Sequence, residues 1–219
     1  MSKVVIIDYD MGNLFSVQQA CANVGLETVI SKNTEEIKSA NAIILPGVGS
    51  FNEAMLNLSK FDLIGPIKSS VNNKIPLLGV CLGMQLLFEE SEEFGNTQGL
   101  GLVKGSVIKF QDRDYNGSKV KIPQINWNKI YYPENRNSFN NPLLKDIKEN
   151  EFMYFVHSYY VSNKEIDTIS CITKYADIEY CSGIKKDNII AFQFHPEKSA
   201  TEGLKIYSNF KQMIEYGAK

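Results

Sequence analysis

A cysteine between two glycines is the clearest candidate for chemistry in this sequence. Cys81 stands in the segment GVCLGMQ, where the apolar run at 75–80 gives way to a helix predicted to begin near Gly83. A strained turn between a strand and a helix holds a nucleophile out of a buried sheet, and glycines such as Gly79 and Gly83 remove side chains that would collide there. The positive end of the helix also favours the thiolate form of cysteine. The pattern by itself fits a buried structural thiol about equally well.

The sequence offers two histidines as a base for this thiol, and only one has an acidic neighbour. His195 stands in the segment FQFHPEKS, where residues i and i+2 of an extended chain point the same way, so Glu197 can reach the imidazole. The carboxylate would orient the ring and stabilise the imidazolium that forms when it takes the thiol proton. His157, in YFVHSYY, is interpreted as a wall residue. We therefore predict a thiol–imidazole–carboxylate set of Cys81, His195 and Glu197.

Backbone donors for a developing oxyanion are predicted at two places. The amide of Leu82 directly follows the nucleophile. The loop PGVGSF, at 46–51, follows another predicted strand, and its glycines allow the backbone to approach a substrate or to reverse a peptide. Loss of one oxyanion donor typically lowers kcat about 10²–10³-fold, so the conformation of this loop could switch the activity.

The elements that must position these residues alternate along the first half of the chain. Runs rich in Ile, Val and Leu are predicted strands at 4–8, 27–30, 41–47 and 75–80. A helix is predicted over 13–25, and the alternation indicates a parallel sheet with both faces covered, which binds ligands beyond the carboxyl ends of its strands. Beyond about residue 100, short strands around an Asn-Gly turn at 116–117 predict a mixed or antiparallel extension, closed by a helix at roughly 202–216.

The composition fits one globular domain, predicted over 1–219, because no Pro/Gly/Ser-rich linker interrupts it. The net charge of -2, without blocks of like charge, predicts neither a nucleic-acid nor a membrane partner. The N-terminal apolar run is too short for a secretion signal, and no later segment reaches a spanning length. The four cysteines lack metal-site spacing, so we predict reduced thiols in a cytoplasmic protein, with no metal and no cofactor.

Five segments in this order resemble the class I (triad) glutamine amidotransferases: PGVGSF, GVCLGMQLLFEES, GLGLVKGSVIKF, YFVHSYY and FQFHPEKS. Within that class, the opening DYDMGNLFSV and the pair Lys198-Ser199 resemble the glutaminase subunits of imidazole glycerol phosphate synthase, the HisH type. The resemblance runs nearly end to end and is least distinctive at 132–150. It implies the flavodoxin-like α/β fold of that class, an open, mostly parallel sheet with helices on both faces.

The resemblance implies a role for each matching position. Cys81 would attack the side-chain amide of L-glutamine, forming a γ-glutamyl thioester and releasing ammonia. His195 would act as base and then as acid, oriented by Glu197. The oxyanion hole, completed by a peptide flip in the glycine-rich loop, would involve Leu82, Val48 and Gly49. Glutamine would be held by Gly49, Gln85, Ser158 and Tyr159.

The resemblance also implies a partner. Ammonia would pass into a separate (β/α)₈ barrel cyclase, the HisF type, docked over the active site as a heterodimer. In histidine biosynthesis that barrel makes imidazole glycerol phosphate and an aminoimidazole ribotide. Positions expected at or near the docking face are Asn13, Trp127 and Lys198. Trp127, the single tryptophan, fits a role as core filler equally well.

Two segments depart from the family pattern. Before Trp127 the family usually shows Pro-His-Met/Ile-Gly, whereas this chain has the segment PQIN at 123–126. Asp10 stands where a glycine is common. Neither departure touches the predicted triad, but both bear on the partner. The first alternative is therefore the same glutaminase chemistry serving a paralogous barrel that aminates or amidinates surface sugars.

Other functions fit the sequence less well. A free-standing cysteine hydrolase of the γ-glutamyl hydrolase or peptidase kind would act without a partner, and the His-Pro-Glu segment with the PGVG and HSYY elements argues against it. A degenerate relative kept as a binding subunit would lack a triad member, and none is missing. The anthranilate and carbamoyl phosphate types of amidotransferase fit the segment DYDMGNL less well.

Overall fold

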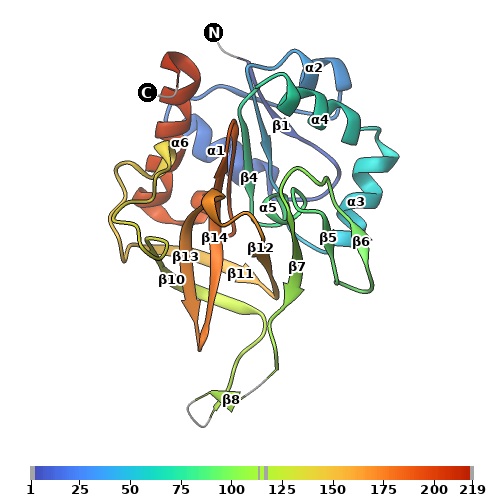
Figure 1. The fold of residues 1–219 in the computed structure, drawn as a ribbon. Helices are drawn as coiled ribbons and strands as arrows, with labels where there is room; N and C mark the ends of the chain where they lie inside the picture. The colour runs from blue at the N-terminus through green and yellow to red at the C-terminus, as the bar shows by residue number, and fades with distance from the viewer. Residues whose placement is uncertain (1–2, 113, 116–117, 218–219) are drawn as a thin grey trace.

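An open sheet with helices on both faces organises the molecule (Figure 1). The computed structural model describes residues 3–112, 114–115 and 118–217. The parallel part of the sheet has the spatial order β2-β1-β3-β4-β15. Its strands are β1 (Val4–Ile7), β2 (Thr28–Ser31), β3 (Ala42–Leu45), β4 (Leu77–Val80) and β15 (Ile189–Phe192). The strands predicted in the first half of the chain are confirmed, with small shifts at their ends.

The helices divide between the two faces of this sheet (Figure 1). One face carries α1 (Leu14–Asn23) and α6 (Ala200–Tyr216), and the other carries α2 (Thr34–Lys38), α3 (Phe51–Lys60) and α4 (Ile64–Asn72). Successive strand residues point to opposite faces, so Val4 and Ile6 pack in the core under α1 and α6, whereas Val5 and Ile7 pack under the other helices. A strand covered on both sides is apolar at every position, which is the pattern that the sequence shows.

The short helix α2 was not predicted from the sequence. α2 is short, and Asn33 caps it by accepting hydrogen bonds from the amides of Glu35 and Glu36. Its apolar contribution to the core is Ile37, a single buried residue. One buried position gives no helical periodicity, so the signal available in the sequence was Asn33 with Glu36 three residues later, a pattern typical of a helix N-terminus.

The second half of the chain forms an antiparallel extension, as predicted. Its main strands are β7 (Gly105–Lys109), β10 (Gln124–Tyr131), β11 (Phe152–His157), β12 (Tyr159–Asn163), β13 (Ile169–Tyr175) and β14 (Ile178–Lys186). Shorter elements are β5 (Glu90–Ser91), β6 (Thr97–Gln98), η1 (Pro142–Leu144), η2 (Ile166–Thr168) and η3 (Pro196–Lys198). β14 then pairs with β15, which returns the chain to the parallel part beside β4.

A two-stranded hairpin projects from the body of the molecule (Figure 1). Its strands are β8 (Asp114–Tyr115) and β9 (Ser118–Lys119). The predicted Asn-Gly turn at 116–117 lies outside the described residues.

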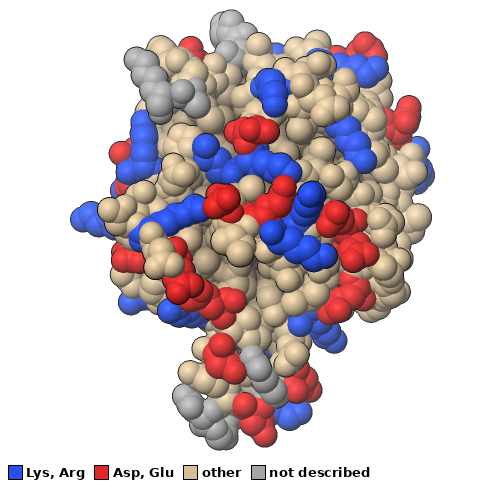
Figure 2. Space-filling model, in the orientation of Figure 1, with Lys and Arg blue, Asp and Glu red and all other residues tan. Residues whose placement is uncertain are grey.

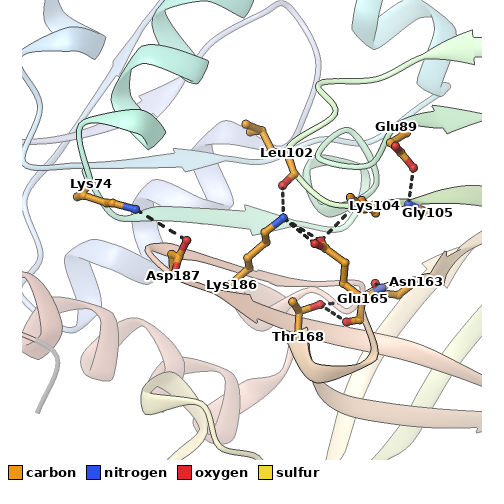
Figure 3. Close-up of polar contacts among 10 residues, drawn as sticks. All are labelled: Lys74, Glu89, Leu102, Lys104, Gly105, Asn163, Glu165, Thr168, Lys186 and Asp187. Carbon is orange, nitrogen blue, oxygen red and sulfur yellow. Dashed lines mark hydrogen bonds and ion pairs between the residues drawn. The ribbon is translucent and has the colours of Figure 1, made fainter.

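Lys186 ties the turn before β7 to the segment that follows β12 (Figure 3). Its Nζ lies 2.8 and 3.0 Å from the carboxylate oxygens of Glu165 and 3.0 Å from the carbonyl oxygen of Leu102. Glu165 also accepts a hydrogen bond from the Lys104 amide at 3.1 Å, and the bond from Lys186 holds the pKa of its carboxyl below the usual value. The cluster anchors the chain just after the C-terminal end of β12. Tyr159, a predicted site residue, lies at the other end of the same strand.

The surface carries both signs of charge. Figure 2 shows Lys and Arg side chains beside Asp and Glu over one face of the molecule, without a block of one sign. Within the described part of the chain, no helix is both long enough and apolar enough to cross a membrane.

Candidate active site

The pairing of β4 with β15 brings two distant parts of the chain together. Phe192 pairs with Val80, and the amide of Cys81 donates to the carbonyl oxygen of Phe192 at 2.8 Å. The two strands are parallel, so the residues that follow them emerge at the same edge of the sheet. Cys81 and His195 both lie at this edge.

The turn that carries Cys81 is strained, and the glycines beside it have a steric reason. Cys81 has φ 55° and ψ −112°, a conformation that non-glycine residues rarely adopt. A Cβ at Gly83 would overlap the carbonyl oxygen of Leu45, and a Cβ at Gly79 would lie 2.9 Å from that of Ala191. The flanking glycines therefore allow the close contact that the sequence analysis expected.

The helix after Cys81 is a single turn. α5 spans Leu82–Gln85 and begins one residue earlier than expected. A full helix dipole needs several aligned turns, so one turn favours a thiolate less than a longer helix would. The helix dipole expected from the sequence is therefore weaker here than a longer helix would supply.

His195 and Glu197 form a buried pair. His195 Nδ1 donates to Glu197 Oε1 at 2.7 Å, and the two side chains are 2% and 1% exposed. His195 Nε2 is buried and makes no hydrogen bond within the described part of the chain, which leaves it available to Cys81. Burial lowers the pKa of His195, but the thiolate of Cys81 and the carboxylate of Glu197 outweigh it and raise the pKa to about 10.

His157, the other histidine, lines the pocket that opens on Cys81, as the sequence analysis predicted. Its Nδ1 faces the carbonyl oxygen of Tyr159 at 2.8 Å, and its Nε2 faces the hydroxyl of Tyr180 at 3.2 Å. Burial lowers the pKa of His157 to about 4, so the ring is neutral at physiological pH. Both of its nitrogens already have partners, unlike those of His195.

A pocket of about 480 Å³ opens on Cys81. It brings together the residues predicted for the oxyanion hole and for glutamine: Val48, Gly49, Leu82, Gln85, Ser158 and Tyr159. Gln85 Nε2 donates to the carbonyl oxygen of Tyr159 at 2.9 Å. The sequence-predicted residues therefore share one cavity, and their roles in it stay predictions.

Glu93 is a pocket residue that the sequence analysis missed. It lines the cavity, is largely buried, and accepts a hydrogen bond from the amide of Phe51 at 2.6 Å. Burial raises the pKa of this carboxyl, and the Phe51 amide opposes the shift. In the sequence Glu93 ends the acidic run FEESEE, which has the appearance of a solvated surface. A pattern of charges carries no signal that would have singled it out.

The glycine-rich loop at 46–51 accepts a hydrogen bond from the predicted oxyanion donor, the Leu82 amide. The amide of Leu82 donates to the carbonyl oxygen of Gly47 at 3.3 Å. The Tyr9 hydroxyl donates to the Pro46 carbonyl oxygen at 2.6 Å and leaves no room for a Cβ at Gly47. The peptide between Gly47 and Val48 thus points its oxygen toward the site where an oxyanion would form. A reversal of this peptide would release Leu82 and turn the Val48 N–H toward the same place.

An exposed aromatic cluster lies beside the pocket. Trp127 is 47% exposed, and its ring meets Tyr154 edge to face at 6.0 Å between centroids. Lys198 lines the pocket and holds its Nζ 5.9 Å from the Tyr154 ring. The alternative of Trp127 as core filler is wrong, because the side chain lies on the surface. Asn13, the remaining predicted interface residue, is exposed and caps α1 through the amide of Ser16.

The two departures from the family pattern have local partners. Asp10 has φ 61°, the left-handed region in which glycine is favoured, and its carboxylate pairs with Lys32 Nζ at 2.8 Å. Gln124 is buried and donates to Asn126 Oδ1 at 3.1 Å.

Comparison with known proteins identifies relatives over nearly the whole chain. The family described as glutamine amidotransferase class-I matches residues 5–213. A Bacillus velezensis protein named imidazole glycerol phosphate synthase subunit HisH is 44% identical over 208 residues, 95% of each chain. The Aquifex aeolicus protein of the same name is 42% identical over 214 residues, 97% of this chain and 98% of its own.

Solved structures share the fold at lower identity. The Trypanosoma brucei CTPS glutaminase domain with bound acivicin aligns with a TM-score of 0.69 and 18% identity, covering 100% of this chain and 96% of its own. PurLQS from Thermotoga maritima aligns with a TM-score of 0.71 and 16% identity, covering 99% of each chain. These alignments confirm the predicted α/β fold.

Proposed function

The chain belongs to the class-I glutamine amidotransferases and, within them, to the HisH subunits of imidazole glycerol phosphate synthase, and from this premise we propose that it hydrolyses L-glutamine at Cys81 and passes the ammonia to a synthase subunit. The observation that carries the mechanism is the buried pair of His195 and Glu197 at the sheet edge that presents Cys81. A thiol, an imidazole and an orienting carboxylate are the groups that acyl transfer through a covalent intermediate needs.

Hydrolysis proceeds in two half-reactions. The proton of Cys81 passes to His195, and the thiolate attacks the side-chain carbonyl carbon of glutamine. His195 returns the proton to the leaving nitrogen, so ammonia departs and a γ-glutamyl thioester remains. Water then gives a proton to His195 and cleaves the thioester, which releases glutamate and restores the thiol. Throughout, the 2.7 Å hydrogen bond to Glu197 keeps Nε2 of the ring directed toward the reacting atoms.

The oxyanion of each tetrahedral intermediate needs donors that this conformation withholds. The Leu82 amide is engaged by the Gly47 carbonyl oxygen, so the subunit by itself is in a resting state. Reversal of the Gly47–Val48 peptide would supply two amides, those of Val48 and Leu82. A docked partner that favours the reversed peptide would therefore switch glutamine hydrolysis on.

The pocket binds glutamine through its α-ammonium group. Both hydrogens of the Gln85 amide are engaged, by Tyr159 and by Gln193, so Gln85 offers its carbonyl oxygen to the pocket. Glu93 adds a carboxylate to the same cavity. These two oxygen acceptors suit the α-ammonium group of the substrate, which places its side-chain amide toward Cys81.

We expect Glu93→Gln to raise the KM for glutamine about 30-fold or more while changing kcat little, because a buried charge-assisted hydrogen bond to the ammonium is lost. Steady-state kinetics of the complex with its barrel partner measures the change. Glu92→Gln is the matched control, since the neighbouring carboxylate is exposed and accepts from the Lys109 amide outside the pocket. Equal KM values for the two variants would contradict the role of Glu93.

The partner surface is the exposed face beside the pocket mouth. Trp127 pairs with Tyr154 across β10 and β11, and Ile125 and Phe152 of the same strands are also exposed. An apolar face next to a catalytic cavity supports docking of a second subunit there, and Lys198 at the pocket rim supports the same surface. We propose that a (β/α)₈ barrel cyclase binds here as a heterodimer and receives the ammonia.

The histidine pathway is the proposed destination of the nitrogen. The relatives at 42% to 44% identity carry the HisH name, which supports this pathway over surface-sugar amidation. The second candidate, a sugar-amidating barrel, is favoured by the two departures from the family pattern, Asp10, which pairs with Lys32, and the segment at 123–126 with its buried Gln124.

We expect glutamine turnover by the isolated subunit to be about 10²–10³-fold below that of the complex with the histidine-pathway barrel and its ribotide substrate, because oxyanion donors are worth that factor. Ammonia or glutamate release is measured for the subunit alone, with the barrel from the same genome, and with barrel and ribotide. Strong stimulation supports the histidine pathway. A barrel that neither binds nor stimulates overturns that assignment and directs the search to a sugar-amidating barrel. High turnover without any partner would instead favour the free-standing hydrolase.

A further inference from the structure

A buried glutamine connects the nucleophile to the substrate pocket. Gln193 follows β15 and is fully buried. Its backbone N–H donates a hydrogen bond to the Ser182 carbonyl oxygen at 2.9 Å, which fixes the backbone. Its side chain lies between two residues of the site. Nε2 is 3.7 Å from Cys81 Sγ, and Oε1 accepts a hydrogen bond from Gln85 Nε2 at 2.9 Å.

The hydrogen bonds of Gln85 fix which end of Gln193 faces the sulfur. Gln85 Nε2 donates both to Tyr159 and to Gln193, so the acceptor on Gln193 must be its oxygen. The amide nitrogen of Gln193 is therefore the end that meets Cys81. It carries hydrogens, and a thiolate accepts hydrogen bonds.

The sulfur needs such a donor. Cys81 Sγ also lies 3.9 Å from the carbonyl oxygen of Val156, an acceptor that suits the neutral S–H but not the thiolate. The helix that begins at Leu82 is only one turn long, and the Leu82 amide is engaged by Gly47. Within the described residues, the donors left for the charged sulfur are the imidazole of His195 and the amide of Gln193.

We propose that Gln193 is a catalytic residue whose Nε2–H group donates a hydrogen bond to the Cys81 thiolate while its Oε1 holds Gln85 in the orientation that receives glutamine. This inference rests on the proposed function and deepens it. The proton of the thiol goes to His195, and no bond forms to Gln193. The hydrogen bond weakens when the sulfur becomes a thioester and strengthens again when hydrolysis restores the thiolate.

The test measures the sulfur without substrate or partner. The full chain reacts with iodoacetamide over a range of pH, and mass spectrometry follows alkylation at Cys81. All four cysteines are buried, so the alkylated peptide identifies the residue that reacted; burial raises the pKa of Cys21 and of Cys181 to about 12, which keeps these two thiols protonated at neutral pH. His195 and the Tyr9 hydroxyl are the titratable groups that interact with Cys81 from neighbouring elements, and the substitutions leave both in place.

Gln193→Met keeps the volume and removes the donor, and Gln193→Glu keeps the shape and adds negative charge beside the sulfur. We expect the pH of half-maximal alkylation to rise by about one unit in Gln193→Met and by more in Gln193→Glu, because each loses stabilisation of the thiolate. At pH 7 the alkylation rate falls about tenfold. The kcat of glutamine hydrolysis in the complex falls at least as much.

Asn209→Leu is the matched control, because it removes another buried amide, one that donates to the Leu143 carbonyl oxygen. It is expected to leave the alkylation profile unchanged. The test uses two variants of Gln193. If the melting temperature shows that one of them is unfolded, the alkylation profile of the other still decides the result. Alkylation profiles of Gln193→Met and Gln193→Glu that coincide with the parent profile would overturn the role of Gln193 while leaving the glutaminase standing. A parent complex without glutamine turnover would overturn the proposed function, and the role of Gln193 with it.

Discussion

Replacing Cys81 with alanine is expected to lower glutamine turnover by about 10⁴-fold or more, to the level of the uncatalysed background. Among the described residues that line the pocket, Cys81 is the only cysteine, so no second thiol is there to form the γ-glutamyl thioester. The small side chain fits the strained turn at least as well as cysteine, so the fold is retained. Glutamate release by the variant, alone and with the proposed barrel partner, measures the loss, and an unchanged melting temperature shows that the subunit is intact.

Cys181→Ala is the matched control for this variant. Cys181 is buried, and its Sγ donates to the Gly183 carbonyl oxygen, a contact within β14 rather than in the pocket. Its loss is expected to cost about 1 kcal/mol of stability and to leave turnover within about twofold of the parent. Full activity in Cys81→Ala would refute the thioester mechanism, whatever the partner.

Replacing Gly83 with alanine is expected to disrupt the nucleophile turn itself. The added Cβ would overlap the Leu45 carbonyl oxygen, which belongs to β3 and cannot move without breaking the sheet. The first turn of α5 must therefore lift away from the sheet, and Cys81 with it. We expect the free energy of unfolding to fall by about 3 kcal/mol or more and kcat to fall at least about 10²-fold. Urea denaturation and glutaminase kinetics measure the two effects.

Gly65→Ala separates this steric effect from the general effect of the substitution. Gly65 lies in α4, with nothing within 4 Å of the Cβ that would be added. Alanine favours a helix more than glycine does, but Pro66 follows directly and disfavours a helical conformation for a residue with a Cβ, so the two effects oppose each other. This variant should stay within about 1 kcal/mol of the parent stability and keep its turnover. If Gly83→Ala were as stable and active as Gly65→Ala, the close packing of the turn would not be what selects glycine there.

The two histidines show which properties of the site follow from local spacing in the sequence and which follow from tertiary contacts. His195 and Glu197 stand two positions apart, and that spacing predicted their pairing. The expected reason was wrong, because the segment is not extended: Glu197 lies in the 3-10 turn η3, whose N-cap is His195, and this turn brings the carboxylate to the ring. The same reasoning identified His157 only as a residue without an acidic neighbour. That its ring is neutral and already hydrogen-bonded depends on Tyr159 and on Tyr180 from another strand.

Glu93 and Gln193 could not be found from the sequence. Glu93 resembles any solvated carboxylate in an acidic run, yet the packing of α3 against its loop buries it and directs the Phe51 amide to it. Gln193 reaches Cys81 across 112 positions of the chain and Gln85 across 108. No periodicity encodes a contact between a strand end and a turn so far apart.

By itself, the sequence determined the parts of this protein that depend on neighbours along the chain. These are the strained turn around Cys81, the spacing of His195 and Glu197, and the apolar strands that must be covered on both faces, because sterics and alternation act over a few residues. Only the tertiary structure decided that β15 lies beside β4, and that the Gly47 carbonyl oxygen takes the Leu82 amide. Those outcomes depend on which surfaces pack together, and many strand orders would satisfy the same local pattern.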